Sequence, residues 1–238
     1  MKQVFITGTS RGLGKALAET FIAKGWMVVG IGRTHTISHA QYIPIVADLS
    51  LPGSAETVGM SIQQDAQHVA FIHNAASLGH IAPLGQNDAE LLQKGFQLNL
   101  TSVAILTNRF LALTADQQYT RSIVSISSGA SKNAYDGWGM YCSSKAGLDA
   151  LMQVLVQEVK LQNDTRTQVW TIAPGVIDTE MQAQIRTSSH HEFSNVERFI
   201  ELKNQQQLSS PEAVALKLID HLFGTTPLEN GRYDIREL

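Results

Sequence analysis

A tyrosine and a lysine stand four residues apart in Tyr141-Cys142-Ser143-Ser144-Lys145, where a segment with a helical pattern begins. Residues four apart lie on one face of a helix, so the ammonium of Lys145 would lie near the phenol of Tyr141. A nearby cation favours the phenolate, and we expect it to lower the tyrosine pKa from its ordinary value of about 10. Tyr141 is therefore a candidate general acid. In isolation, the same spacing is more typical of a half-exposed tyrosine beside a solvated lysine.

A glycine-rich run, Thr7-Gly8-Thr9-Ser10-Arg11-Gly12-Leu13-Gly14, joins a β-type segment to a helical one. Glycines let the backbone turn tightly and approach a pyrophosphate, while the following helix presents free N–H groups and the positive end of its dipole. The position of this loop at the start of an alternating chain favours a dinucleotide site. The alternative is a tight strand-to-helix turn without a ligand.

The residues after the second β-type segment indicate which dinucleotide would bind. An acid about 20 residues beyond the glycines binds the ribose hydroxyls of NAD, whereas an arginine suits the extra phosphate of NADP. No acid occurs between Glu19 and Asp48, and Arg33 stands at the expected place. Arg11 adds a second positive charge from the glycine loop. These residues predict NADPH rather than NADH.

Further motifs follow in a fixed order. Ser128 lies thirteen residues before Tyr141, Asn99 stands in Gln97-Leu98-Asn99-Leu100, and Pro174-Gly175-Val176-Ile177-Asp178-Thr179 comes later. With the T-G-x-x-x-G-x-G loop, this order resembles the short-chain dehydrogenase/reductase family. The resemblance implies carbonyl reduction, in which Ser128 binds the substrate oxygen and Tyr141 protonates it. Lys145 would hold the nicotinamide ribose, and the backbone of Asn99 would hold a water beside Lys145.

The resemblance also implies a set of cofactor contacts. Asp48 matches the family's acid near the adenine, although a turn or cap is its alternative role. The segment His73-Asn74-Ala75-Ala76 resembles the family's N-N-A-G segment, with His and Ala replacing its two ends. The implied contacts are Gly8, Ser10, Arg11, Gly12, Leu13, Gly14, Arg33, Asp48, Leu49, Asn74, Ala75, Tyr141, Lys145, Pro174, Gly175, Val176 and Thr179.

Residues 127–141, 174–186 and 198–200 resemble more narrowly the bacterial benzil reductases of the sepiapterin-reductase-like branch, which reduce one carbonyl of an aromatic 1,2-diketone. Besides Ser128, the predicted substrate contacts are the apolar residues Tyr135, Trp138, Met181 and Phe193, with Phe199 a further candidate. Each is equally consistent with ordinary packing. Two alternatives remain: a 3-oxoacyl-thioester reductase, and a protein that senses NADP without catalysis. Such sensors tend to lose the tyrosine or the lysine.

The elements that must position these residues alternate along the chain, which predicts a doubly wound α/β fold with a mainly parallel seven-stranded sheet and helices on both faces. We expect one dinucleotide-binding (Rossmann) domain over residues 1–238, with a substrate lid at about 178–209. The alternative for 178–209 is a surface elaboration without function. The predicted strands are 3–7, 27–31, 43–46, 69–73, 122–127, 168–173 and 232–235. The predicted helices are 12–24, 54–65, 88–115, 141–161 and 211–223.

Composition restricts the class of protein. The 238 residues carry a net charge of −3 without a basic block, so we expect no nucleic-acid partner and no anionic membrane surface. One cysteine and the absence of a signal-like or spanning apolar run predict a cytoplasmic protein.

The adjacent His190 and His191 lack ligand partners at metal spacing, so we predict no metal. Residues 148–159 carry a broad apolar face that members of the resembled family pack against the sheet and often against a twin subunit, so the resemblance implies a homodimer or homotetramer.

Overall fold

In the computed structural model, which describes residues 1–115 and 119–238, seven parallel strands form one sheet in the order β3-β2-β1-β4-β5-β6-β7. The strands are β1 Lys2–Thr7, β2 Met27–Gly32, β3 Tyr42–Val46, β4 His68–His73, β5 Thr120–Ile126, β6 Thr167–Ala173 and β7 Gly231–Asp234. The predicted fold class is confirmed, and each strand end lies within two residues of its prediction. The direction of winding reverses between β1 and β4, which opens a crevice at their carboxyl ends.

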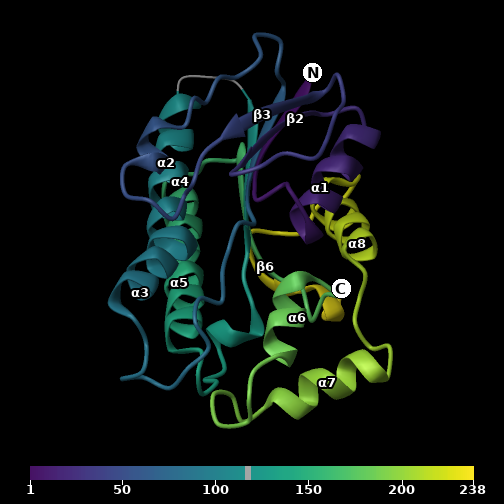
Figure 1. The fold of residues 1–238 in the computed structure, drawn as a ribbon. Coiled ribbons are helices and arrows are strands. Elements are labelled where there is room, and N and C mark those ends of the chain that lie inside the picture. Colours follow the sequence, from purple (N-terminus) through teal and green to yellow (C-terminus); the bar gives the residue numbers. More distant parts are fainter. Residues whose placement is uncertain (116–118) are drawn as a thin grey trace.

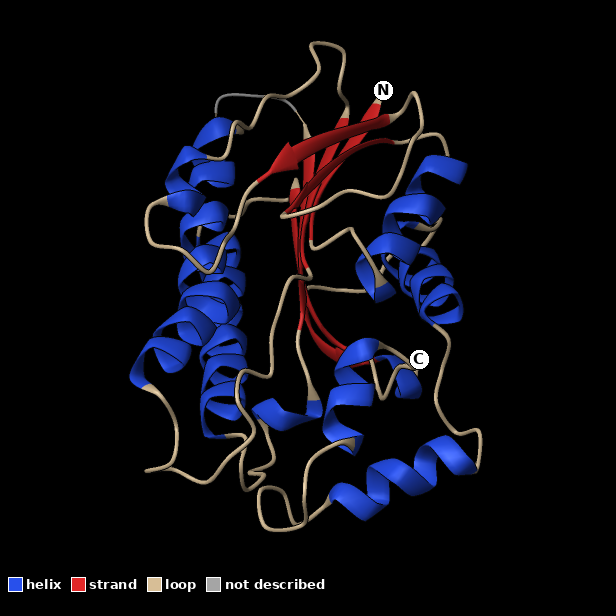
Figure 2. Cartoon of the chain, in the orientation of Figure 1, coloured by secondary structure: helices blue, strands red, loops and turns tan. Residues whose placement is uncertain are grey.

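Helices cover both faces of the sheet (Figures 1 and 2). Alternate residues of β1 divide between the two layers: Val4 and Ile6 pack under α1 Gly12–Ala23 and α8 Pro211–Phe223, whereas Phe5 packs in the opposite layer. That second layer contains α2 Ser54–Thr57, α4 Ser102–Leu113 and α5 Gly139–Leu161. Because both faces of the sheet are covered in its centre, the central strands β2 and β4 are nearly continuous apolar runs. No helix within the described ranges is long and apolar enough to cross a membrane.

Two of the predicted helices are wrong in extent. The helix predicted over 54–65 ends at Thr57, because Val58 takes a non-helical conformation and Gly59 follows it. The helix predicted over 88–115 is divided into α3 Ala89–Phe96, a π-helical turn Gln97–Thr101, and α4. A π turn carries one extra residue in the helical ladder and is found often at functional sites. Asn99 lies in this turn.

Residues 178–209 are more regular than the sequence pattern indicates, because they contain α6 Glu180–Arg186 and α7 Val196–Asn204. Figure 1 shows both helices beyond the carboxyl end of the sheet. The two ends of residues 178–209 are hydrogen-bonded to each other. The amide of Ser209 donates to Val176 O at 3.1 Å, and the amide of Asp178 donates to Ser209 O at 3.0 Å. α8 then begins as predicted, with Ser210 Oγ accepting from Ala213 N at 3.1 Å.

Candidate active site

A cavity of about 1560 Å³ runs along the carboxyl ends of the strands. Its wall includes the glycine loop, the ends of β2, β4 and β5, the first turns of α5, and the segment that leads from β6 into α6. Every cofactor contact implied by the sequence lines this cavity, as do Ser128, Tyr135, Trp138 and Met181. Two predicted residues do not line it, Asn99 and Phe193, and each lies behind a residue that does.

The glycine loop fits the phosphates of a dinucleotide. Arg11 is the N-cap residue of α1, and no side chain caps the free amides of the first turn, which borders the cavity. Gly8 and Gly12 have φ angles of +77° and +55°, which favour glycine. A Cβ on Gly14 would lie 2.1 Å from the carbonyl oxygen of Gly8, so this position must also be glycine.

Asn74 holds the glycine loop in place from the end of β4. Its Nδ2 donates to Thr7 O at 3.0 Å and to Gly8 O at 3.2 Å. The Thr7 hydroxyl in turn accepts from the amides of Asn74 and Ala75, each at 3.0 Å. Asn74 is therefore a structural clamp between β1 and β4 as well as a residue of the cavity wall.

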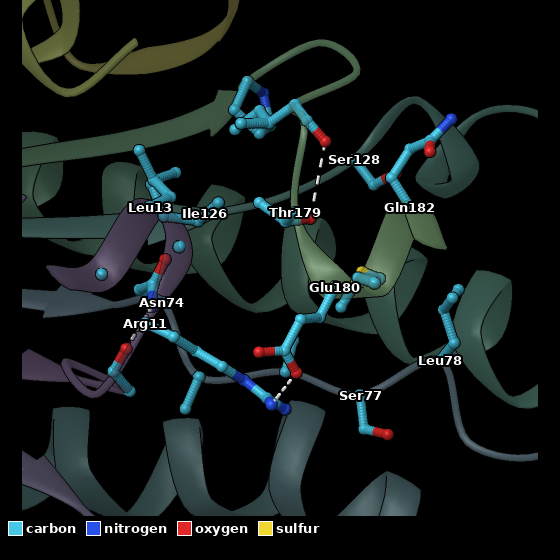
Figure 3. Close-up of a pocket in the computed structure, with 18 of the residues that line it drawn as sticks. Arg11, Leu13, Asn74, Ser77, Leu78, Ile126, Ser128, Thr179, Glu180 and Gln182 are labelled. Atoms are coloured by element: carbon cyan, nitrogen blue, oxygen red, sulfur yellow. Dashed lines mark hydrogen bonds and ion pairs between the residues drawn. The ribbon is translucent and has the colours of Figure 1, made fainter. Parts of the chain in front are cut away.

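The two arginines differ in their surroundings. Arg33 follows β2 and lines the cavity, and the nearby Thr36 hydroxyl donates to Ser10 O at 3.0 Å, which joins this loop to the glycine loop. Arg11 forms an ion pair with Glu180 at the start of α6 (Figure 3). It is thus already partnered by an acid from the other wall of the cavity, which the sequence did not indicate.

The Asp48 side chain stabilises the turn that follows β3, which is the role expected of it if it does not contact the adenine. Its Oδ1 accepts from the hydroxyl of Ser50 at 2.6 Å and from the amide of Ser50 at 3.0 Å. These hydrogen bonds, the hydroxyl first, lower the pKa of Asp48 against the raising effect of burial. The carboxylate lies in the cavity wall but is oriented by its own turn.

Sequence reasoning missed a polar chain behind the Arg33 loop. The hydroxyl of Tyr42 bonds with the hydroxyl of Thr9 at 2.7 Å and with Nδ1 of His35 at 2.7 Å. Nε2 of His35 lies 3.1 Å from Ile45 O. A Cβ on Gly30 would lie 2.1 Å from the Tyr42 hydroxyl, so glycine in β2 makes room for this chain.

Tyr141, Lys145 and Ser128 meet in the middle of the cavity. Lys145 is 3% exposed, donates from Nζ to Ile126 O at 2.8 Å, and lies 5.8 Å from the centroid of the Tyr141 ring. The Ser128 hydroxyl accepts from Ala130 N at 3.1 Å. The tyrosine and the lysine therefore share one face of α5, as the spacing predicts.

The expected lowering of the Tyr141 pKa is wrong for this structure. Burial raises the pKa of Tyr141 to about 12, although its hydrogen bond with Ser128 acts in the opposite direction. Burial also lowers the pKa of Lys145 to about 8, against the raising effect of the Asp149 carboxylate. In both groups desolvation outweighs the opposing effect, which is the Ser128 hydrogen bond for Tyr141 and the Asp149 carboxylate for Lys145, because both side chains are enclosed by protein.

Asn99 ties three segments together from within the π turn. It is 1% exposed, its Oδ1 accepts from Ser77 N at 2.9 Å, and its Nδ2 donates to Ser77 O at 2.8 Å and to Ser144 Oγ at 3.0 Å. Ser144 in turn donates to the carbonyl of Tyr141 at 2.9 Å. Sequence reasoning missed Ser77 and Ser144, and the only signal for Ser144 was its position inside the Tyr-Lys motif.

The aromatic end of the cavity is a packed cluster. Phe193 as a direct substrate contact is a wrong prediction: it is 0% exposed and stacks under Trp138 with centroids 4.8 Å apart and planes at 14°. Trp138 and Phe199 face the cavity, and Tyr135 lies 5.0 Å from Trp138. Phe193 is a support for the aromatic wall, because the loop before α7 folds its ring beneath Trp138.

The chain can be compared with known proteins. The model of the short chain dehydrogenase family matches residues 2–190. This chain belongs to that family. Members of the family are oxidoreductases that bind nicotinamide cofactors, and the cavity built around the glycine loop agrees with that chemistry.

Relatives of known function cover the chain from end to end. Benzil reductase ((S)-benzoin forming) of Bacillus subtilis (strain 168) is 38% identical over 244 residues, covering 100% of this chain and 99% of the relative. The enzyme of the same name from Bacillus cereus is 33% identical, with 97% of each chain covered. Sepiapterin reductase of Meriones unguiculatus is 30% identical, covering 91% of this chain and 89% of the relative.

A similar crystal structure supports the same fold. The KRED1-Pglu enzyme is 28% identical with a TM-score of 0.81, covering 98% of this chain and 100% of that one. The predicted branch, close to benzil and sepiapterin reductases, is confirmed by these relatives.

Proposed function

We propose that this protein is an NADPH-dependent carbonyl reductase of ketones and 1,2-diketones, with aromatic diketones of the benzil type preferred. The observation that carries the proposal is the placement of Ser128, Tyr141 and Lys145 in one cavity with an uncapped glycine loop. Two relatives named benzil reductase, similar over nearly their whole length, support the substrate class.

NADPH bound along the glycine loop would supply the hydride. The substrate carbonyl oxygen would accept hydrogen bonds from the hydroxyls of Ser128 and Tyr141. The raised pKa of Tyr141, about 12, keeps the phenol protonated at neutral pH, so it holds the proton that the developing alkoxide requires. Lys145, with a pKa of about 8, is mainly an ammonium at neutral pH and stabilises the phenolate left after that transfer. Asn99 positions the helix turn behind Lys145.

The preference for NADPH rests chiefly on Arg33. No acid stands in residues 20–47 to bind the ribose hydroxyls of NADH or to repel a phosphate. The loop that carries Arg33 is joined to the glycine loop through Thr36, and Arg33 lines the same cavity as the glycine loop, which favours a role for its guanidinium in binding the extra phosphate. Arg11 contributes less, because Glu180 competes with a phosphate for it.

The aromatic wall supports the choice of substrate. Trp138, Tyr135, Phe199 and Met181 present apolar surface beside the candidate catalytic groups, and Trp138 lies 5.7 Å from Tyr141, ring to ring. A flat aromatic ketone would bury its ring there while its carbonyl meets Ser128. Residues 178–209 would act as the substrate lid of a single domain, and exposed Val154 and Leu161 on α5 support association with a second copy.

The test is a steady-state assay of NADPH and NADH oxidation with benzil, 1-phenyl-1,2-propanedione and an acetoacetyl thioester. We expect the diketones with NADPH to give the highest kcat/KM. Tyr141→Phe should lower kcat by about 10²–10⁴-fold with NADPH binding retained. Preference for the thioester would support a 3-oxoacyl-thioester reductase instead. Tight NADPH binding without turnover of any carbonyl would indicate a sensor protein.

A further inference from the structure

A second buried charge cluster lies directly behind the catalytic face of α5. Asp149 stands four residues after Lys145, on the same helical face, and is 7% exposed. Its Oδ1 accepts from the hydroxyl of Ser127, and its Oδ2 accepts from Nε of Arg232 at 2.7 Å. Both carboxylate oxygens are therefore bound by groups from other elements, one from the end of β5 and one from β7.

Arg232 extends the cluster to the backbone of Ser128. Its side chain is 14% exposed, and its second nitrogen, Nη2, lies 3.4 Å from Ser128 O and 3.2 Å from Ser131 Oγ. The hydroxyl of Ser131 donates to the same carbonyl at 2.9 Å. The guanidinium thus links the Asp149 carboxylate to the turn at residues 128–131, which carries the Ser128 side chain. A planar guanidinium with several N–H donors can make all of these contacts at once.

From this geometry we propose that Asp149 and Arg232 are positioning residues for the reaction, which hold Ser128 in place and keep Lys145 in its ammonium form. The inference rests on the proposed carbonyl reduction. Neither residue lines the cavity, so each acts through Ser128 or Lys145 rather than by touching the substrate.

The charges around Lys145 support the second part of this role. Tyr141 and Asp149 lie on the same face of α5 as Lys145, and Arg232 lies beyond Asp149 on β7. On β4, His73 is close enough for Lys145 to lower its pKa. Of these groups, Asp149 is the carboxylate that raises the pKa of Lys145 against burial. Neutral His73 contributes no compensating charge, because burial lowers its pKa to about 3.

The chain offers a matched control pair. Arg121 and Asp164 form an ion pair with the same 2.7 Å distance, and their side chains are 14% and 11% exposed, against 14% and 9% for Arg232 and Asp149. Arg121 lies near the amino end of β5, whereas Ser127 follows its carboxyl end, which places the two pairs about 20 Å apart. Asp164→Asn therefore removes an equivalent buried charge far from the cavity.

The experiment compares Asp149→Asn, Arg232→Lys and Asp164→Asn by kcat, KM and the pKa of Lys145. That pKa is followed by NMR of protein isotope-labelled at the lysine ε-carbons, with Lys145→Met assigning the signal. We expect Asp149→Asn to lower kcat about tenfold or more, to lower the Lys145 pKa, and to move the alkaline limb of kcat to lower pH. Arg232→Lys should lower kcat without that shift in pKa, because it retains the charge.

The outcomes separate the inference from the proposed function. Equal kcat and equal Lys145 pKa in Asp149→Asn and Asp164→Asn would overturn the positioning role, as would an Arg232→Lys enzyme with unchanged kcat. If Asp149→Asn fails to fold while Asp164→Asn folds, Arg232→Lys decides the claim on Ser128. Asp149→Ser, which also removes the carboxylate, then decides the claim on Lys145. Absence of carbonyl reduction by the wild type would refute the proposed function, while the NMR shift would still test the link between Asp149 and Lys145.

Discussion

Acid should destabilise this fold through two histidines on β4. His73 is 3% exposed, and burial, with a further contribution from Lys145, lowers its pKa to about 3. Burial and Lys2 lower the pKa of His68 to about 4. In the unfolded chain both titrate near about 6.5. Between about pH 4 and 6.5 the unfolded state binds more protons, so the free energy of unfolding rises with pH in this window and levels off above it.

The magnitude follows from these values. At about pH 5 an unfolded histidine is almost fully protonated and a folded one is not, so each removes about 2 kcal/mol from the free energy of unfolding relative to pH 7. The two together remove about 4 kcal/mol, a large share of the roughly 5–15 kcal/mol of a typical domain. Carboxylates such as Asp164, whose folded pKa is about 2, act mainly below this window.

Urea unfolding followed by tryptophan fluorescence at about pH 7, 6 and 5 measures the effect. His73→Asn should reduce the difference in the free energy of unfolding between pH 7 and pH 5 by about 2 kcal/mol, independently of any loss of stability at pH 7 itself. The control is Phe71→Leu, which removes the ring stacked 4.4 Å from His73 but leaves the imidazole. It should lower stability equally at every pH. An unchanged pH dependence in His73→Asn would refute the reasoning.

Three further predictions concern the cavity. Arg33→Ala should raise KM for NADPH about tenfold and leave KM for NADH nearly unchanged in the steady-state assay, because a charge-assisted hydrogen bond is lost. Phe193→Ala should destabilise the protein by about 3–5 kcal/mol in urea unfolding and raise KM for benzil, with NADPH binding unchanged, because Trp138 loses its support. Glu180→Gln should free Arg11 and tighten NADPH binding by no more than about fivefold in a fluorescence titration, because an exposed ion pair is weak.

Local signals were sufficient for the strands and for much of the cavity wall. Buried parallel strands such as β4 are short apolar runs between turns, so their positions follow from the sequence. The pair Tyr141 and Lys145 was found because a helix converts a spacing of four into proximity. The helix predicted over 54–65 is wrong beyond Thr57, because Val58, Met60 and Ile62 pack on the core from a non-helical segment, and apolar spacing alone does not distinguish such a segment from a helix.

Features that depend on two distant segments cannot be inferred from the sequence. The ion pair of Arg11 with Glu180 joins residues 169 positions apart, and the contact of Arg232 with Asp149 joins residues 83 apart. Phe193 was predicted to contact substrate because its type is right, yet the loop before α7 places it beneath Trp138. Residue type cannot show which side of an aromatic layer faces the ligand.

The sequence by itself determined the alternation of strands and helices, the glycine loop and the order of the catalytic motifs, because each depends on residues close together in the chain. The tertiary structure decided the electrostatics. Burial raises the pKa of Tyr141 to about 12 where spacing alone predicted a lowering, since the desolvation of a phenol depends on all the segments that enclose it. Only the folded chain, likewise, brings β7 to the back of α5 and places Arg232 against Asp149.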